Sequence, residues 1–177
     1  NINWICVQLP EKIDVTSDGL NDGYNTISEI SMERIKRATK KIKEENPDYK
    51  GDLGFKVFKL DTSNIKRWEA GFDTLKEDMW NAVDYLQKDR SQEDVLYELL
   101  LKYGLDLTVP IETKTIGGKT VYSIGLGALV VCLDDEITMD VVNGIGKLKE
   151  ELQPEIMRVV FKDDGFKDDV VKTNALQ

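Results

Sequence analysis

Two apolar runs near the start of the chain have the pattern of β-strands. Residues 3–8 (NWICVQ) form a nearly continuous apolar stretch, which predicts a strand buried on both faces, as in parallel sheets. Residues 54–60 (GFKVFKL) alternate apolar and basic side chains, which predicts a strand with one covered face. A helix predicted between them completes a strand–helix–strand unit, and units of this kind are joined by a right-handed parallel crossover.

The helix between these strands has a recognisable start and end. Thr26 and Glu29 have the spacing of a capping box, and Ser31 is a second candidate for the cap. The helix is predicted to run to about Glu45, because Asn and Pro follow at residues 46–47. Its apolar positions fall on one face and predict a buried stripe of three residues: Ile35, Ala38 and Ile42.

The remaining residues alternate between predicted helices and strands. A helix is predicted from apolar residues at helical spacing: Leu75, Met79, Ala82, Val83 and Leu86. Ser91 and Asp94 cap the next helix, and Gly104 stops it. Strands are predicted at 105–115, 119–124, 128–133 and 156–161, with a hairpin turn at the glycines 117–118. A helix over 138–151 and a last helix from residue 168 or 169 complete an α/β pattern.

Composition excludes several functional classes. Of the 177 residues, 41% are hydrophobic and 32% charged, which is typical of a folded globular protein. The net charge of -9, from 24 basic and 33 acidic side chains, argues against a freestanding nucleic-acid binder. The chain has no histidine. This excludes Ser-His-Asp and Cys-His catalysis and zinc held by histidine.

Charge is distributed unevenly along the chain, which predicts a domain boundary. Residues 1–64 carry 10 basic and 11 acidic side chains, whereas residues 65–177 carry 14 and 22. We therefore divide the chain into domains 1–64 and 65–177. Because the chain begins at Asn1 and enters a predicted strand at once, we expect it to be a fragment.

The apolar runs also predict where the protein is located in the cell and whether its cysteines are buried. None approaches the ~20 residues that a membrane span needs, and no signal peptide opens the chain, so we expect a cytoplasmic protein without a membrane partner. Cys6 and Cys132 each lie inside an apolar run, and we expect both to be buried structural thiols.

Acidic pairs follow two of the predicted strands. One pair is Asp134 and Asp135, and the other is Asp163 and Asp164. If the two strands are parallel neighbours, both pairs lie at the same carboxyl edge of the sheet, where α/β proteins place their sites. Converging carboxylates would suit Mg²⁺ and phosphoryl or phosphodiester chemistry. The alternative is that they lie in solvated turns and cap the following helices.

Two further motifs have alternative interpretations. Six of the ten residues 34–43 are basic: Arg34, Lys36, Arg37, Lys40, Lys41 and Lys43. This density suits contacts to phosphate, whereas i,i+4 pairing with nearby glutamates suits an ordinary solvated face. Residues 125–127 (GLG) look like the start of a phosphate-binding loop, but a third glycine is missing and an apolar run follows. We therefore expect a tight connection between strands there.

Three ordered stretches together resemble one known family. They are 4–11 (WICVQLPE) with 30–37 (ISMERIKR), then 54–64 (GFKVFKLDTSN), and finally 158–169 (RVVFKDDGFKDD) continuing into 172–175 (KTNA). The chain resembles the C-terminal third of the modification subunit of type III restriction–modification systems, an adenine-specific DNA methyltransferase. The family's Asp-Pro-Pro-Tyr and Phe-x-Gly-x-Gly motifs are absent. The resemblance therefore implies that this chain holds no catalytic residue.

The resemblance also implies a fold and an activity. Residues 1–64 would supply the C-terminal strands and helix of a Rossmann-like S-adenosylmethionine-dependent methyltransferase fold, and residues 65–177 a small α/β assembly domain. The full-length protein would be an enzyme that methylates the exocyclic amino group of a flipped-out adenine, and this chain alone would be inactive. Its implied partners are DNA through an upstream part, the restriction (helicase/nuclease) subunit, and a second copy in a homodimer.

By the same resemblance, four residues would contact S-adenosylmethionine. Gln8 and Glu11, at and after the end of the first predicted strand, would receive the ribose hydroxyls, and Asp61 and Asn64 would contact the adenine amino group. Loop capping is the alternative for all four. Two other functional classes stay open: a small Mg-dependent phosphatase or nuclease-like domain using the acidic pairs above, and an interaction module without a ligand.

Overall fold

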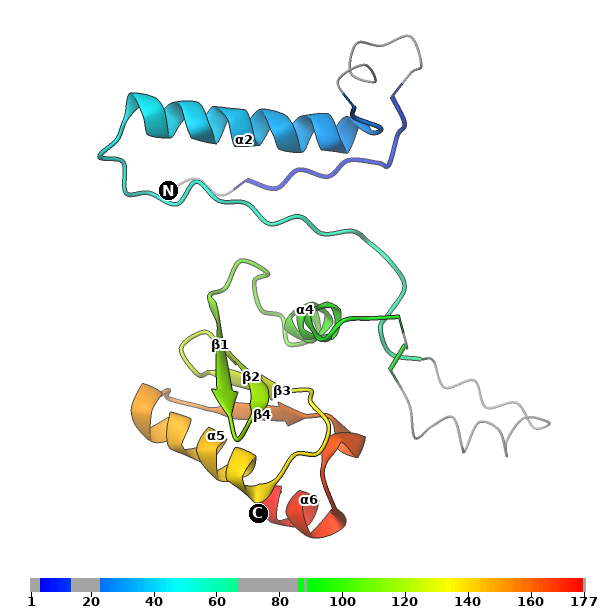
Figure 1. Cartoon of the computed structure of the whole chain (residues 1–177), viewed down its shortest axis with the longest axis vertical. Helices are drawn as coiled ribbons and strands as arrows, with labels where there is room; N and C mark the ends of the chain where they lie inside the picture. Colours follow the sequence, from blue (N-terminus) through cyan, green and yellow to red (C-terminus); the bar gives the residue numbers. More distant parts are fainter. Residues whose placement is uncertain (1–3, 14–22, 67–85, 88, 177) are drawn as a thin grey trace, which may run out of the picture. The chain divides into compact units, whose positions relative to one another are not determined.

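The structure, a computed structural model, describes residues 4–13, 23–66, 86–87 and 89–176 (Figure 1). Contacts divide the chain into two compact units, Asn1–Phe58 and Lys59–Gln177. We call them the first and the second unit and describe each by itself. Within the described residues, no helix is both long enough and apolar enough to cross a membrane.

The first unit is built around α2, which spans Ile27–Glu45 (Figure 1). Its predicted capping box is confirmed. The Thr26 hydroxyl accepts a hydrogen bond from the backbone N–H of Glu29 at 3.3 Å, and the Glu29 carboxylate accepts one from the backbone N–H of Thr26 at 3.2 Å. At the other end, the N–H of Asn46 donates to the carbonyl of Ile42, so the helix ends where the sequence predicted.

The predicted buried stripe of α2 is wrong. No residue of this helix is buried. Ile35 is half-buried, whereas Ala38 and Ile42 are exposed. The reason is that only short extended segments accompany the helix in the described part of the first unit, and these do not cover its apolar face.

The two strands predicted for residues 3–8 and 54–60 are also wrong as far as the structure describes them, because residues 4–8 and 54–60 have no regular structure. The only β pairing among the described residues of the first unit is an isolated bridge between Lys12 and Thr26. A strand is stable only beside a partner strand, and the apolar side chains of both segments lie mostly exposed. The segments still approach each other, with 6.5 Å between the ring centroids of Trp4 and Phe55.

The second unit contains a four-stranded mixed sheet in the order β1-β2-β3-β4. The strands are β1 (Ile111–Ile116), β2 (Lys119–Ile124), β3 (Leu129–Cys132) and β4 (Arg158–Phe161). The first three pair antiparallel, with Ile116 opposite Lys119 at the hairpin, and β3 pairs parallel with β4. The chain is therefore a mixed α/β protein.

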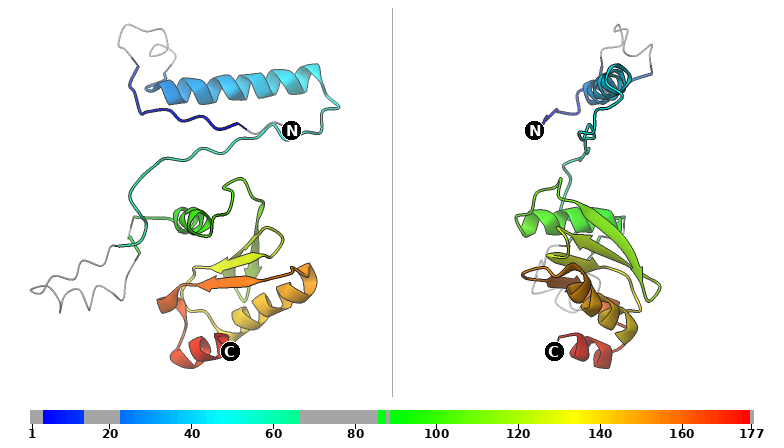
Figure 2. Two further views of the ribbon diagram at one scale, coloured as in Figure 1. Left: turned by 180° about the vertical axis from the view of Figure 1, so that it is seen from behind. Right: turned by 90° about the vertical axis from the view of Figure 1, so that its left-hand side faces the viewer.

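Helices cover both faces of this sheet (Figure 2). α4 (Gln92–Lys102) covers one face and α5 (Met139–Leu152) the other, whereas the 3-10 turn η1 (Asp163–Gly165) and α6 (Asp169–Ala175) follow β4. One core lies between α4 and the sheet and contains Leu96, Leu100 and Ile124. The other lies between α5 and the sheet and contains Val121, Val141 and Ile145. Each strand thus places alternate side chains in two different cores.

Most predicted elements of the second unit are confirmed, with one correction. The predicted strand over residues 105–115 begins only at Ile111, because residues 106–109 form a turn. The Asp106 carboxylate accepts a hydrogen bond from the backbone N–H of Thr108 at 2.8 Å, and the Asp106 carbonyl accepts one from Val109. Of the helix predicted from Leu75 to Leu86, all but Leu86 lies outside the described residues.

Candidate functional site

Residues 61–66, the first described segment of the second unit after Leu60, are attached to α4 by hydrogen bonds. Asn64 is the residue that anchors it: its backbone N–H donates to the Glu98 carboxylate at 2.7 Å, and its side-chain amide donates to the Asp94 carbonyl at 2.9 Å. Its carbonyl accepts from Gln87, and the residue is only 9% exposed. The Ser63 hydroxyl adds a bond of 2.6 Å to Glu98. Asn64 therefore has a structural role in this segment.

Asp61 lies at the exposed end of the same segment. Its carboxylate accepts hydrogen bonds from the Arg90 guanidinium at 2.7 Å and from the backbone N–H of Thr62 at 2.7 Å. The Arg90 hydrogen bond, followed by the Thr62 one, lowers the pKa of Asp61 to about 2. The side chain stays 58% exposed and ionised at neutral pH, so it can still accept a further hydrogen bond.

Glu98 is the acceptor on which this segment depends. Burial by itself raises the pKa of the Glu98 carboxyl. Hydrogen bonds from Ser63 and Asn64, together with the Lys102 ammonium at 3.0 Å, have a larger opposite effect, so the pKa is lowered to about 2. The sequence did not predict that Glu98 binds Asn64 or that Arg90 binds Asp61. No local pattern marks these two partners, because each contact joins positions about 30 residues apart.

Gln8 and Glu11 belong to the first unit, whereas Asp61 and Asn64 belong to the second. Both Gln8 and Glu11 are exposed. The backbone of Glu11 is fixed, since its N–H donates to the Leu9 carbonyl and its carbonyl accepts from Ile27. Its carboxylate has no hydrogen-bond partner within the described residues and is free to accept one.

The two acidic pairs lie at one edge of the sheet, as predicted, because β3 and β4 are parallel neighbours. Lysines are bound to three of the four carboxylates. The Lys162 ammonium lies 2.8 Å from Asp135 and 3.6 Å from Asp164, and Lys172 lies 2.7 Å from Asp163. The hydrogen bond to Asp135 is the main reason that the pKa of Lys162 is raised.

The fourth carboxylate, that of Asp134, is part of the scaffold. It accepts hydrogen bonds at 2.6 Å from the Gln92 amide and from the backbone N–H of Thr120, and so joins α4 to β2. Across the described ranges, no three carboxylate or thiol groups gather closely enough to hold a metal ion. The interpretation of these residues as a magnesium site is therefore not supported.

Residues 125–127 form the tight connection between β2 and β3 that the sequence predicted. Gly125, Leu126 and Gly127 all have positive φ, of 59°, 58° and 89°. β3 follows the turn, so no helix N-terminus faces it, and phosphate-binding loops need one. The expectation for the cysteines was right only for Cys132, which is buried; Cys6 is exposed.

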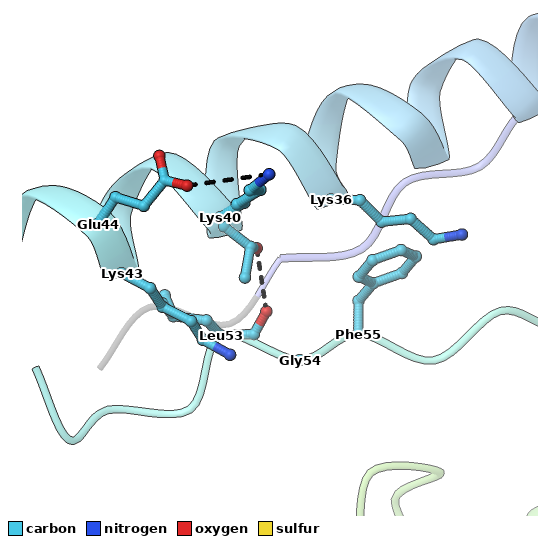
Figure 3. Close-up of a pocket in the computed structure, with 8 residues that line it drawn as sticks. Lys36, Lys40, Lys43, Glu44, Leu53, Gly54 and Phe55 are labelled. Atoms are coloured by element: carbon cyan, nitrogen blue, oxygen red, sulfur yellow. Dashed lines mark hydrogen bonds and ion pairs between the residues drawn. The ribbon is translucent and has the colours of Figure 1, made fainter. Parts of the chain in front are cut away.

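A basic groove runs along α2 in the first unit (Figure 3). It has a volume of about 610 Å³ and lies between the helix and the segment around Phe55. Lysines at three positions line it: Lys36, Lys40 and Lys43. The sequence marked these lysines by their density but did not predict that an aromatic and an aliphatic residue face them across a groove.

Comparison with known proteins places the chain beside modification subunits. It is 31% identical over 115 residues to the Mod subunit of the type III restriction-modification enzyme EcoP15I of Escherichia coli, which covers 65% of this chain and 16% of that protein. It is 55% identical over 40 residues to the StyLTI Mod subunit of Salmonella typhimurium, which covers 23% of this chain and 6% of that protein. No known protein-family profile matches. The chain thus spans under a fifth of the length of the relatives it matches, and over the matched part it is similar to type III Mod subunits.

Proposed function

We propose that this chain is part of a site-specific DNA adenine methyltransferase of the type III modification-subunit kind. The similarity to two Mod subunits, 31% over 115 residues and 55% over 40, is the observation that supports the proposal. In that reaction S-adenosylmethionine supplies a methyl group to the exocyclic amino group of a flipped-out adenine. We assign no reacting group to this chain, because it carries neither an Asp-Pro-Pro-Tyr nor a Phe-x-Gly-x-Gly motif.

The two parts of the chain take different roles in this proposal. Residues 1–64 contribute to a Rossmann-like methyltransferase fold, and residues 65–177 form an assembly domain. The proposed partners of that domain are a second modification subunit and the restriction subunit, while DNA binds the whole enzyme. The second unit supports a role in assembly through β4, whose outer edge has no partner strand within the described residues.

The fit of the cofactor residues differs from one to the next. A ribose needs acceptors for its two hydroxyl hydrogens, and Glu11 offers an exposed carboxylate for them, with Gln8 three residues before it. Asp61 keeps an ionised and accessible carboxylate. Asn64 is the least accessible of the four, because it is only 9% exposed, and its side-chain NH2 group donates to the Asp94 carbonyl while its amide oxygen is the atom that would accept from the adenine amino group. We therefore propose Gln8, Glu11, Asp61 and Asn64 as cofactor contacts, with Asn64 also anchoring its own segment.

Genome-wide mapping of N6-methyladenine tests the activity. Deleting the gene that encodes this chain from its source organism should remove methylation from one sequence motif and leave other motifs unchanged. Restoring the gene should restore that motif. If every methylated motif survives the deletion, the proposed function is wrong.

Calorimetric titration of S-adenosylmethionine tests the cofactor residues without relying on activity. Glu11→Gln removes the carboxylate and should weaken binding about tenfold, the loss of roughly one charge-assisted hydrogen bond. Glu155→Gln makes the same chemical change at an exposed position in the loop before β4 and should leave binding unchanged. Equal affinities of the two variants would contradict the assignment of Glu11.

A further inference from the structure

The basic residues of the first unit are concentrated on one part of one helix. Residues 34–43 contain six basic and no acidic side chains, although the chain as a whole has a net charge of -9. At an ionic strength of 0.1 M charges are screened beyond a distance of about 10 Å, so a ligand at this helix senses mainly the charge of α2, which carries six basic and four acidic side chains and is net positive. The surplus of acidic residues elsewhere therefore does not decide what binds here.

Helical geometry brings three of these lysines to one side. Lys36, Lys40 and Lys43 follow each other at intervals of four and three residues, which places them along one face of α2. The distance along the helix axis from Lys36 to Lys43 is about 10 Å, at 1.5 Å per residue. All three residues are exposed and line the groove described above; in Figure 3 Lys36 and Lys43 extend toward the segment around Phe55, whereas Lys40 extends toward Glu44.

The other wall of the groove is fixed to the helix. The Thr39 hydroxyl donates a hydrogen bond to the carbonyl of Leu53 at 3.3 Å. Leu53, Gly54 and Phe55 form this wall, and Lys36 extends alongside the Phe55 ring (Figure 3). The groove thus combines a row of cations with an apolar surface held in place by a hydrogen bond.

Most of the positive charge in the groove is not neutralised by the protein. Lys36 and Lys43 have no ion-pair partner in the part of the chain that the structure describes. Lys40 has one, Glu44, but the distance of 3.9 Å is long and both side chains are largely exposed. Ion pairs of this kind contribute little, so an anion can replace Glu44 as the partner of Lys40. Two of the other basic residues of the helix pair with glutamates: Arg37 with Glu33 at 2.8 Å and Lys41 with Glu45 at 3.7 Å.

The spacing and openness of the groove favour a polymeric anion. Over about 10 Å of its axis, a DNA duplex carries about three phosphates on each strand. Three lysines in a row over the same length match this charge density. An isolated small anion would need converging donors, whereas these lysines form a line along an open surface.

We propose that the groove of α2 lined by Lys36, Lys40 and Lys43 binds the phosphodiester backbone of duplex DNA without reading its sequence. This deepens the proposed function, on which it rests, by naming a surface of this chain that contacts the DNA. The contacts fix the position of the DNA and carry no sequence information.

Fluorescence anisotropy with the whole chain and a labelled duplex of about 20 base pairs and arbitrary sequence tests the proposal. The wild-type protein should bind, and the triple variant Lys36→Gln/Lys40→Gln/Lys43→Gln should bind at least about tenfold more weakly at low salt. Glutamine keeps the helix propensity close to that of lysine, so α2 should persist and circular dichroism should be unchanged. The dependence of log K on log salt concentration should become less steep by about 2.7, which corresponds to three lost phosphate contacts.

Two further variants make the result specific. Lys147→Gln/Lys149→Gln/Lys167→Gln removes the same charge from exposed positions of the second unit and should leave affinity and salt dependence nearly unchanged. Glu44→Gln removes the carboxylate in the groove and should tighten binding about two- to threefold, a gain that misfolding cannot produce.

The outcomes separate this inference from the proposed function. Equal losses of duplex affinity in the two triple variants, or no binding of the duplex by the wild-type chain, would overturn the proposal that the groove binds DNA, whatever the cofactor titration gives. Binding to phosphatidylserine vesicles but not to the duplex would also overturn it. A groove-dependent affinity for the duplex in a protein whose gene deletion leaves genomic methylation intact would support the groove and refute the methyltransferase.

Discussion

At the scale of single residues, Glu98 has the largest share in positioning residues 61–66. Its carboxylate is only 16% exposed and accepts hydrogen bonds from both Ser63 and Asn64. Hydrogen bonds to a charged acceptor contribute about 1.5–3 kcal/mol each to stability. The segment contains Asp61, a proposed cofactor contact, so Glu98 affects the site as well as the stability of the protein.

We expect Glu98→Gln to lower the free energy of unfolding by about 1–3 kcal/mol at pH 7, because the amide replaces an ionised acceptor. The pKa of Glu98 is about 2 in the folded protein, below the usual 4.5. The carboxylate therefore stabilises the protein fully above pH 4.5, and this contribution is lost as the pH falls toward 2. Urea unfolding measured across this pH range should show that the free energies of unfolding of the wild type and the variant become equal as the pH falls toward 2. Glu155→Gln, in an exposed loop, should show no such difference at pH 7.

The residue scale also shows which contacts a sequence can predict. The helix caps by Thr26 and Ser91 were predicted correctly, because a capping box needs only residues three positions apart. The contacts of Asn64 could not be predicted, since they depend on a tertiary fold that brings α4 beside it. For the same reason the sequence placed Asp163 and Asp164 at a possible metal edge but did not show that Lys162 and Lys172 bind the carboxylates there.

At the scale of elements, the β1–β2 hairpin depends on its two glycines. Gly117 and Gly118 have φ of 56° and 78°, in the left-handed region that other residues rarely adopt. A Cβ atom at Gly117 would also lie 2.8 Å from a methyl carbon of Val141 in α5. The turn therefore combines a backbone requirement with close packing against a helix.

We expect Gly117→Ala to lower the free energy of unfolding by at least about 1 kcal/mol, through the left-handed backbone and the contact with Val141. Gly146→Ala is the matched control. Gly146 lies in α5 with no atom near the position of its Cβ, so alanine there should raise stability by about 0.5–1 kcal/mol. Thermal unfolding should shift in opposite directions for the two variants. A shift in the same direction would refute this account of the turn.

Elements with local signals were predicted well, and elements that need distant partners were not. Turn glycines and alternation located β2 correctly, at Lys119–Ile124. The apolar runs at residues 3–8 and 54–60 have strand patterns of the same quality. They form no strand in the described residues because a strand also requires neighbours, which a pattern within one segment cannot supply.

At the scale of the whole molecule, burial is concentrated in the second unit. Every buried hydrophobic residue in the described part of the chain belongs to it, whereas the described residues of the first unit include none. Because burial of apolar surface is the main driving force of folding, the second unit should fold without the first.

We expect the isolated fragment 59–177 to unfold cooperatively, with a denaturation midpoint close to that of the whole chain. The thiol of Cys132 gives an independent readout. It is fully buried, and burial raises its pKa, so it should react with Ellman's reagent only on unfolding, whereas the exposed Cys6 of the whole chain should react at once. Rapid labelling of Cys132 in the fragment would mean that the second unit does not fold alone.

The parallel pairing of β3 with β4 has a consequence for the order in which the second unit folds. The partners Ile116 and Lys119 in the hairpin are three positions apart, whereas Leu129 and its β4 partner Arg158 are 29 apart, with α5 between them. Closing a longer loop costs more entropy and takes longer, so we expect the β1–β2–β3 meander to form first and β4 to join last. Until it does, β3 is an open and apolar sheet edge, and the intermediate at that stage is the one most exposed to aggregation.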